Sequence, residues 1–213
     1  MADTGGEQAP LRDFKSRSRA AFDRQARDYD TAPYGRHARR LHDDVMTALD
    51  TFSFADVLDV GCGTGATLAA ILTEYPNVHA RGIDLSAQMI AVSRERLGEG
   101  ADVHVADAEH LPLADGSVDL VTCVDSLHHY PDPRAALAEM HRVTRPGGGL
   151  VLGEWRAAAP FRQLLNWLLP RMSEGDVRIY TAAELTRMAE AAGYSVDGCA
   201  RAGVRGQLLV ARR

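Results

Sequence analysis

Short apolar runs alternate with segments of helical spacing along most of the chain. The runs that predict strands are residues 57–60, 78–83, 103–105, 118–124 and 150–153. The segments that predict helices between them are residues 66–72, 87–97 and 133–143. A near-continuous apolar run such as 118–124 is typical of a strand that helices cover on both faces. Strands that alternate with helices in this way favour an α/β fold around a parallel sheet.

Two further helices, residues 11–29 and 35–49, are expected before the first strand. Residues 1–10 are polar and glycine-containing, and they are expected to be a disordered tail. At the other end, a helix is expected from Thr181 to Gly193. The remaining strand-like segments, 194–199 and 206–211, are expected to finish the sheet as an antiparallel pair.

Three glycines, Gly61, Gly63 and Gly65, directly follow the first strand and precede a helix. Glycine lets the backbone approach a ligand closely, and the free N–H groups of a helix start attract an anionic group. The dinucleotide pattern G-x-G-x-x-G is one residue wider than this one. Asp84, at the end of the second strand, is placed to bind a ribose. An acid at this point does not by itself distinguish a dinucleotide from another cofactor that carries a ribose. An ordinary tight strand-to-helix turn is the alternative interpretation.

Six segments in order resemble the successive motifs of class I S-adenosylmethionine (SAM)-dependent methyltransferases. They are residues 57–65, 82–86, 106–113, 117–121, 127–133 and 145–149. The resemblance covers roughly residues 20–155 and is closest to the small-molecule branch that includes quinone and natural-product methyltransferases. It implies one SAM-binding domain over residues 1–213, with an α/β, Rossmann-like, doubly wound fold. That fold would have a mostly parallel seven-stranded sheet with helices on both faces, and an N-terminal helical lid over residues 11–50.

The same resemblance implies SAM as the cofactor and a small-molecule methyl acceptor, with oxygen, nitrogen or carbon as the nucleophile. Asp84 would bind the ribose, and Asp107 would read the adenine amino group. Tyr29 and Tyr34 are candidate cofactor or acceptor contacts, with core or surface positions as the alternative. The full set of expected cofactor contacts is Tyr29, Asp59, Gly61, Cys62, Gly63, Gly65, Asp84, Leu85, Met89, Asp107, Ala108 and Asp125.

A hydroxyl acceptor gains from a general base. The fourth and fifth strands should be neighbours, and their carboxyl ends would bring His128 and His129 near Glu154. A carboxylate beside an imidazole orients it and raises its basicity. One of the two histidines is therefore a candidate base with Glu154 as its partner. The alternative is that both histidines only shape the end of the strand.

Residues 155–180 follow the fifth strand and are expected to cap the substrate site. Within this cap segment, apolar positions recur with helical spacing over 161–169, a stripe wide enough to need burial. The helix could pack permanently on the sheet, or line an acceptor pocket with Trp155 and Trp167 as aromatic walls. Pairing with the same helix of another subunit is the third alternative, so a monomer and a homodimer both remain open.

Composition narrows the function further. The net charge of −5 argues against a broad nucleic-acid surface, and Lys15 is the only lysine in the 213 residues. The three cysteines, Cys62, Cys123 and Cys199, are scattered, so neither a disulfide framework nor a metal site is expected. No signal peptide or membrane span is predicted, which points to the cytoplasm. A nicotinamide-dependent oxidoreductase and a catalytically silent SAM-binding or partner-binding protein are the rival functions.

Overall fold

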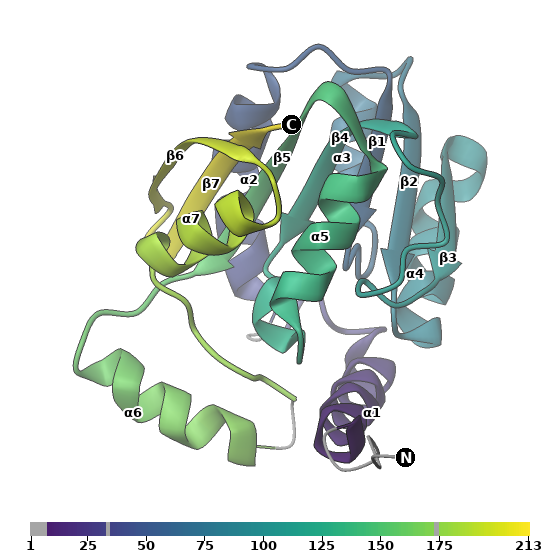
Figure 1. Cartoon of the computed structure of the whole chain (residues 1–213). Helices are drawn as coiled ribbons and strands as arrows, with labels where there is room; N and C mark the ends of the chain where they lie inside the picture. Colours follow the sequence, from purple (N-terminus) through teal and green to yellow (C-terminus); the bar gives the residue numbers. More distant parts are fainter. Residues whose placement is uncertain (1–7, 33–34, 173–174) are drawn as a thin grey trace, which may run out of the picture.

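A computed structural model describes residues 8–32, 35–172 and 175–213. One sheet runs through the molecule in the strand order β3-β2-β1-β4-β5-β7-β6, with helices on both faces (Figure 1). The strands are β1 (Asp56–Val60), β2 (His79–Asp84), β3 (Ala101–Val105), β4 (Val118–Val124), β5 (Thr144–Trp155), β6 (Ser195–Ala202) and β7 (Gly206–Arg212). β1 to β5 are parallel, and β7 pairs antiparallel with both β5 and β6. The predicted doubly wound, mostly parallel seven-stranded sheet is confirmed.

Most helices begin at the positions that the sequence predicts. The longer ones are α1 (Gln8–Gln25), α2 (Arg36–Leu49), α3 (Ala66–Glu74), α4 (Ala87–Leu97), α5 (Pro133–Val143), α6 (Phe161–Leu168) and α7 (Ala182–Ala191). Three short 3-10 turns are η1 (Gly98–Gly100), η2 (Leu127–His129) and η3 (Leu169–Arg171). Ser86 caps α4, Asp132 caps α5, and Thr181 forms a reciprocal capping box with Glu184 at α7. Each cap satisfies N–H groups that the first helical turn leaves free.

Two hydrophobic clusters, one on each face of the sheet, make the core. Leu137 and Met140 of α5 and Leu185 of α7 belong to the first cluster. Leu49 of α2 and Leu68 of α3 belong to the second. Full burial of each such side chain stabilises the fold by about 1.5–3 kcal/mol. Because both faces are covered, the carboxyl edge of the parallel strands is the part of the sheet left for a ligand.

Several boundaries differ from the sequence prediction, most of all at β5 and at α1, which also ends at Gln25 rather than at residue 29. α1 begins at Gln8 rather than at residue 11, so the part of the predicted tail at 1–7 lies outside the described residues. β5 begins at Thr144, six residues before the strand predicted at 150–153. Thr144 pairs with Val118 of β4, and Gly149 pairs with Arg212 of β7, so pairing on both sides lengthens the strand. The register between β4 and β5 shifts between these two points, so residues 145–148 form an irregularity within the longer strand.

α6 stands away from the sheet and is joined to it by extended chain on both sides (Figure 1). Phe161 and Trp167 expose 54% and 59% of their surface, and Leu164 is exposed to a similar degree. None of the eight residues of α6 is buried. The interpretation of α6 as a helix packed permanently on the sheet is therefore wrong. Within the described ranges, no helix is long and apolar enough to cross a membrane.

Candidate functional site

The glycine turn after β1 has the backbone shape that its sequence predicts. Gly61, Gly63 and Gly65 all have positive φ angles, between 52° and 78°. A Cβ at Gly61 would lie 1.9 Å from Ser126 Oγ and 2.7 Å from Tyr130 Oη. A Cβ at Gly63 would meet nothing within 4 Å, so a ligand can approach this backbone closely.

Asp84 is fixed at the end of β2 by the turns on either side of it. Its Oδ2 accepts a hydrogen bond from Gly63 N at 2.9 Å, and its Oδ1 accepts one from Ser86 N at 2.8 Å. Burial raises the pKa of Asp84, although these two bonds and the charge of His129 oppose the rise. The carboxylate keeps free lone pairs that can accept bonds from a ligand hydroxyl.

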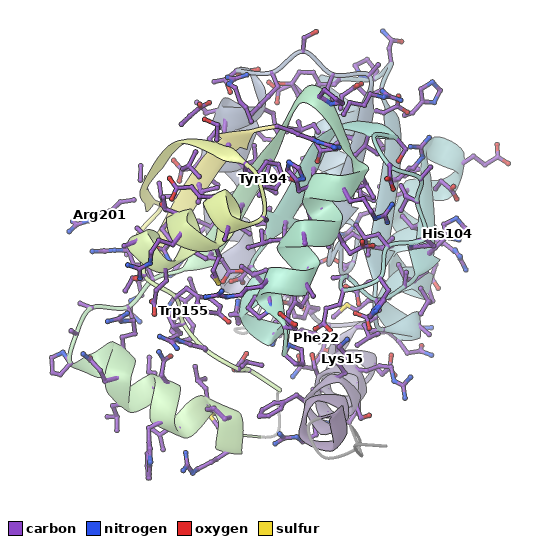
Figure 2. The ribbon with its side chains drawn as sticks, viewed as in Figure 1. Lys15, Phe22, His104, Trp155, Tyr194 and Arg201 are labelled. Atoms are coloured by element: carbon purple, nitrogen blue, oxygen red, sulfur yellow. The ribbon has the colours of Figure 1, made fainter. Side chains whose placement is uncertain are left out.

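Asp107 follows β3 and already has a cationic partner. Lys15 Nζ of α1 lies 2.6 Å from Asp107 Oδ2 and 2.5 Å from Glu109 Oε2. Figure 2 places Lys15 and Phe22 between α1 and the body of the molecule. Asp23 of the same helix accepts a 2.6 Å hydrogen bond from Ser86 Oγ. Lys15 and Asp23 thus hold α1 over the carboxyl edge of the sheet.

The glycine turn, Asp84 and Asp107 line one cavity, whose empty space including its open mouth is about 1130 Å³. Ten of the expected cofactor contacts line it: Tyr29, Gly61, Cys62, Gly63, Asp84, Leu85, Met89, Asp107, Ala108 and Asp125. Asp84, Asp107 and Asp125 suit the hydroxyl and amino donors of an adenosine and the positive sulfonium of SAM. The lining does not suit a pyrophosphate, because among the side chains that the structure describes Lys15 is its one lysine or arginine, and Lys15 is bound to Asp107 and Glu109.

Two expected cofactor contacts do not line this cavity. Asp59 is 2% exposed within β1 and accepts a 2.7 Å hydrogen bond from Thr122 Oγ1. Burial raises the pKa of Asp59 to about 7, with the Thr122 bond opposing the rise. Gly65 instead packs behind the turn, where a Cβ would lie 2.5 Å from Ser93 Oγ. Tyr34 lies outside the described residues.

His128 and Glu154 meet as the sequence predicts, but behind the cavity wall. His128 Nδ1 lies 2.9 Å from Glu154 Oε2, and His128 is 7% exposed. Burial alone would lower the pKa of His128. The charge and hydrogen bond of Glu154, with the charges of Asp125 and Asp176, outweigh burial and raise the pKa to about 10. A histidine that is already protonated at neutral pH cannot accept a proton from an acceptor.

His129 does line the cavity, and its neighbouring carboxylate is Asp176 rather than Glu154. His129 Nδ1 lies 3.0 Å from Asp176 Oδ1, within ion-pair distance but not in the direction of a hydrogen bond. Phe22 of α1 packs edge-on against the His129 ring, with ring centroids 4.8 Å apart. This geometry makes His129 the histidine that an acceptor in the cavity can reach.

His128, His129 and Asp176 bring ligand atoms within 4.8 Å of one another, and these residue types suit a transition metal. The raised pKa of His128 opposes such a site, because a protonated imidazole has no lone pair for a metal. We therefore interpret the group as a set of carboxylate–imidazole contacts.

Several residues of this site escaped the sequence analysis. Lys15 contacts Asp107, which lies 92 residues later in the chain. Asp176 contacts histidines that precede it by almost fifty residues. Ser126 and Tyr130 also line the cavity, and their hydroxyl oxygens lie 2.8 Å apart. Ser126 and Tyr130 flank the paired histidines in the expected motif, which is the signal that could have found them. No local pattern points to Lys15 or Asp176.

Comparison with known proteins gives one matching family, described as a methyltransferase domain, over residues 58–152. A malonyl-[acyl-carrier protein] O-methyltransferase of Laribacter hongkongensis is 40% identical, with 64% of this chain and 50% of that protein aligned. A ubiquinone biosynthesis O-methyltransferase of Thiobacillus denitrificans is 34% identical, with 66% of this chain and 65% of that protein aligned. The chain thus spans between half and two thirds of the length of these relatives.

A solved structure has a similar fold over nearly the whole chain. It is a SAM-dependent methyltransferase from Aquifex aeolicus, with a TM-score of 0.69 and 21% sequence identity. The match covers 89% of this chain and 97% of that one. The likeness extends beyond residues 58–152, which the family match covers, to the sheet as a whole.

Proposed function

Because residues 58–152 match a methyltransferase domain and the chain is similar to proteins named as O-methyltransferases, we propose that it transfers the methyl group of SAM to an oxygen of a small molecule. The cavity at the carboxyl edge of the sheet carries the proposal. Its lining combines the glycine turn, the carboxylates of Asp84, Asp107 and Asp125 among others, and the imidazole of His129. Relatives named as O-methyltransferases support oxygen as the nucleophile.

Asp84 and Asp107 would hold the adenosine part of the cofactor. Asp84 is aligned by Gly63 N and Ser86 N and would accept bonds from ribose hydroxyls. Asp107 would accept a bond from the adenine amino group while Lys15 remains its cationic partner. The glycine turn gives the methionine part room against the backbone. When bound, the cofactor supplies a methyl group on a positively charged sulfur.

His129 is the proposed base. The acceptor oxygen forms a bond to the methyl carbon, the carbon–sulfur bond breaks, and His129 receives the hydroxyl proton. Holding nucleophile and methyl in line accounts for most of the acceleration, up to roughly 7–11 kcal/mol in favourable cases. The base adds typically about 10²–10⁴-fold. His128 instead keeps its proton and fixes the turn that carries His129.

A carboxylate acceptor is the second candidate. Three malonyl-[acyl-carrier protein] O-methyltransferases, from Laribacter hongkongensis, Dechloromonas aromatica and Geobacter sulfurreducens, are among the similar proteins. A carboxylate is already ionised at neutral pH, so it needs no base. The two candidates differ in one measurable respect, since His129→Gln should slow transfer to a hydroxyl far more than transfer to a carboxylate.

The test is methyl transfer by the purified chain from SAM with a labelled methyl group. Phenols, aliphatic alcohols and malonyl thioesters are the acceptor panel, and calorimetry with SAM, NAD and NADP measures cofactor choice. We expect SAM and S-adenosylhomocysteine to bind at micromolar affinity or tighter, and label to appear in an acceptor. Binding of NAD without SAM would favour the oxidoreductase. Tight SAM binding with no transfer to any acceptor would favour a silent binding protein.

A further inference from the structure

Residues 175–180 of the cap segment lead towards α7 (Figure 1) and contact η2, the turn that carries the two histidines. His128 O accepts a 2.8 Å hydrogen bond from Val177 N. On the other side, Ile179 N donates to Asn166 Oδ1 of α6 at 2.8 Å, and Ile179 O accepts from Asn166 Nδ2 at 3.1 Å. Residues 175–180 therefore bridge the histidine turn and α6.

The same stretch contacts the N-terminal helix. A Cβ at Gly175 would lie 2.7 Å from the backbone of Ser18, so α1 and the cap segment approach each other as closely as glycine permits. Gly175 has a φ of +76°, a conformation in which a side chain is strained. Arg17 also donates a 3.3 Å hydrogen bond to Pro170 O. Residue 176 is thus held between α1 and the two histidines.

Asp176 is the one charged side chain that this stretch directs at both rings. Its Oδ1 lies 3.0 Å from His129 Nδ1 and 3.7 Å from His128 Nε2. Burial would raise the pKa of Asp176, but the neighbouring imidazoles of His129 and His128 lower it. Asp176 is therefore an anion at neutral pH, mostly shielded from water.

Glu154 cannot serve His129 in the same way. Its Oε1 accepts hydrogen bonds from Ser126 N and Leu127 N, and its Oε2 is bonded to His128 Nδ1. All of these contacts are with η2 or the residue before it. Glu154 thus holds the turn in place, and the carboxylate left for His129 is Asp176.

We propose that Asp176 is the positioning residue of the base, held against His129 by the contacts that residues 175–180 make with η2 and α1. This inference rests on the proposed function. His129 donates its Nδ1 proton to Asp176, which leaves Nε2 unprotonated for the acceptor hydroxyl. Once Nε2 takes that proton, Asp176 stabilises the resulting imidazolium. Such contacts are often misaligned without substrate and tighten in the reacting complex.

The experiment compares Asp176→Asn with Asp197→Asn, a control whose exposed carboxylate pairs with Arg212 on the far strands. For a hydroxyl acceptor, Asp176→Asn should lower kcat by roughly 10²-fold or more, with SAM affinity changed less than about twofold. Asp176→Glu should recover part of the rate. The control should keep the wild-type kcat, and circular dichroism checks that each variant is folded.

A second readout separates positioning from a merely structural role. Nitrogen-15 NMR of the wild type should show His129 protonated at Nδ1 and free at Nε2 at neutral pH, and Asp176→Asn should mix the two tautomers. Asn166→Ala, which removes the link to α6 and touches neither histidine, should lower kcat by a smaller factor. An unchanged tautomer and an unchanged kcat in Asp176→Asn would overturn the inference.

The remaining outcomes identify which proposal fails. A wild type that transfers no methyl group contradicts the proposed function. An active wild type with an inactive His129→Gln and a normal Asp176→Asn contradicts only the role of Asp176. Loss of activity on chelation, restored by Mn²⁺ or Co²⁺, would make the three side chains metal ligands and would also overturn the positioning role.

Discussion

The cofactor end of the site, which is the cavity itself, and the proposed acceptor end at α6 are built in different ways. At the cofactor end, Asp84 is aligned by two backbone N–H groups and Asp107 by Lys15, so the binding groups are in place before a ligand arrives. The proposed acceptor end is α6, which contributes no described residue to the cavity lining. It exposes Phe161 and Trp167 and is held to the rest of the molecule through Asn166 and Arg162. Preorganised groups cost little to order on binding, whereas a loosely attached helix is ordered by its ligand.

This difference matches what each end has to recognise. The cofactor is the same in every turnover, so a rigid carboxylate frame can be complementary to it. The acceptor distinguishes one methyltransferase from another, and an apolar helix outside the sheet can change without disturbing the core. We expect substitutions at the cofactor end to act on SAM affinity, and those at α6 to act on the acceptor. The turn η2 joins the two ends through His128 and Glu154.

The largest effect should come from breaking the contact between His128 and Glu154. The pKa of His128 in the folded protein is about 10, above its usual 6.5, because nearby carboxylates favour the charged form. Stability from this shift is fully present below about pH 6.5 and is lost as pH rises through about 10. Removing one partner of a buried pair costs about 3–5 kcal/mol. Urea unfolding of wild type and His128→Gln should differ most at pH 6 and progressively less towards pH 10.

A constant difference between the two proteins across this range would show that His128 is neutral in the folded state. His110→Gln is the matched control, because His110 is an exposed histidine on the loop after β3. Its unfolding should follow the wild type at each pH. A neutral His128 would also reopen the question of which histidine is the base.

The next effect tests the cofactor end alone. Asp84→Ala should lose charge-assisted hydrogen bonding to the ribose worth about 1.5–3 kcal/mol in all, which weakens SAM binding by roughly 10- to 150-fold. Calorimetry measures the dissociation constant, and Asp102→Ala on exposed β3 is the control. Equal SAM binding by Asp84→Ala and wild type would mean that the ribose lies elsewhere. The acceptor KM should change much less than the SAM affinity.

The sequence predicts the cofactor end well because its parts are local. The glycine turn and Asp84 each sit at a strand end, and the strand pattern alone brings those ends together. Asp59 was placed wrongly in the cavity because the motif gives its position in β1 but not which way the side chain points. Asp176 and Lys15 were missed since their partners lie far away in the chain. Their positions depend on how α1 and the cap segment fold back.

α6 shows the same limit in another form. Its apolar spacing predicts a helix with one hydrophobic face, and the structure has that helix at Phe161–Leu168. The pattern cannot say what covers the face, because burial against the sheet, an acceptor and a second subunit all favour the same residues. The structure rules out the sheet. The acceptor and the second subunit remain open to experiment.

A smaller effect should appear at the acceptor end. Leu164→Ser and Leu168→Ser remove exposed apolar surface from α6, so melting temperature and SAM affinity should stay near wild type. If α6 binds the acceptor, its KM should rise by about 5- to 30-fold, which corresponds to roughly 1–2 kcal/mol of lost burial. Leu169→Ser is the contrast, since Leu169 is buried and its substitution should lower the melting temperature. A change in native mass instead of KM would assign the face to a dimer.

The smallest effect should come from Lys15, the only lysine, whose ion pair with Asp107 links α1 to the proposed adenine end of the cavity. Lys15→Met keeps the length of the side chain and removes its charge, so Asp107 and Glu109 lose their cationic partner. Partly exposed ion pairs contribute about 0.2–1 kcal/mol. The dissociation rate of S-adenosylhomocysteine should therefore rise by at most about fivefold. Arg19→Met on the exposed side of α1 should leave this dissociation rate unchanged.

Stopped-flow displacement measures the dissociation rate, and the difference between wild type and Lys15→Met should fade at high salt because salt screens the ion pair. An unchanged rate at low salt would show that α1 is held by its other contacts, Asp23 with Ser86 and Phe22 with His129. The cofactor end would then owe its closure to those contacts rather than to the ion pair.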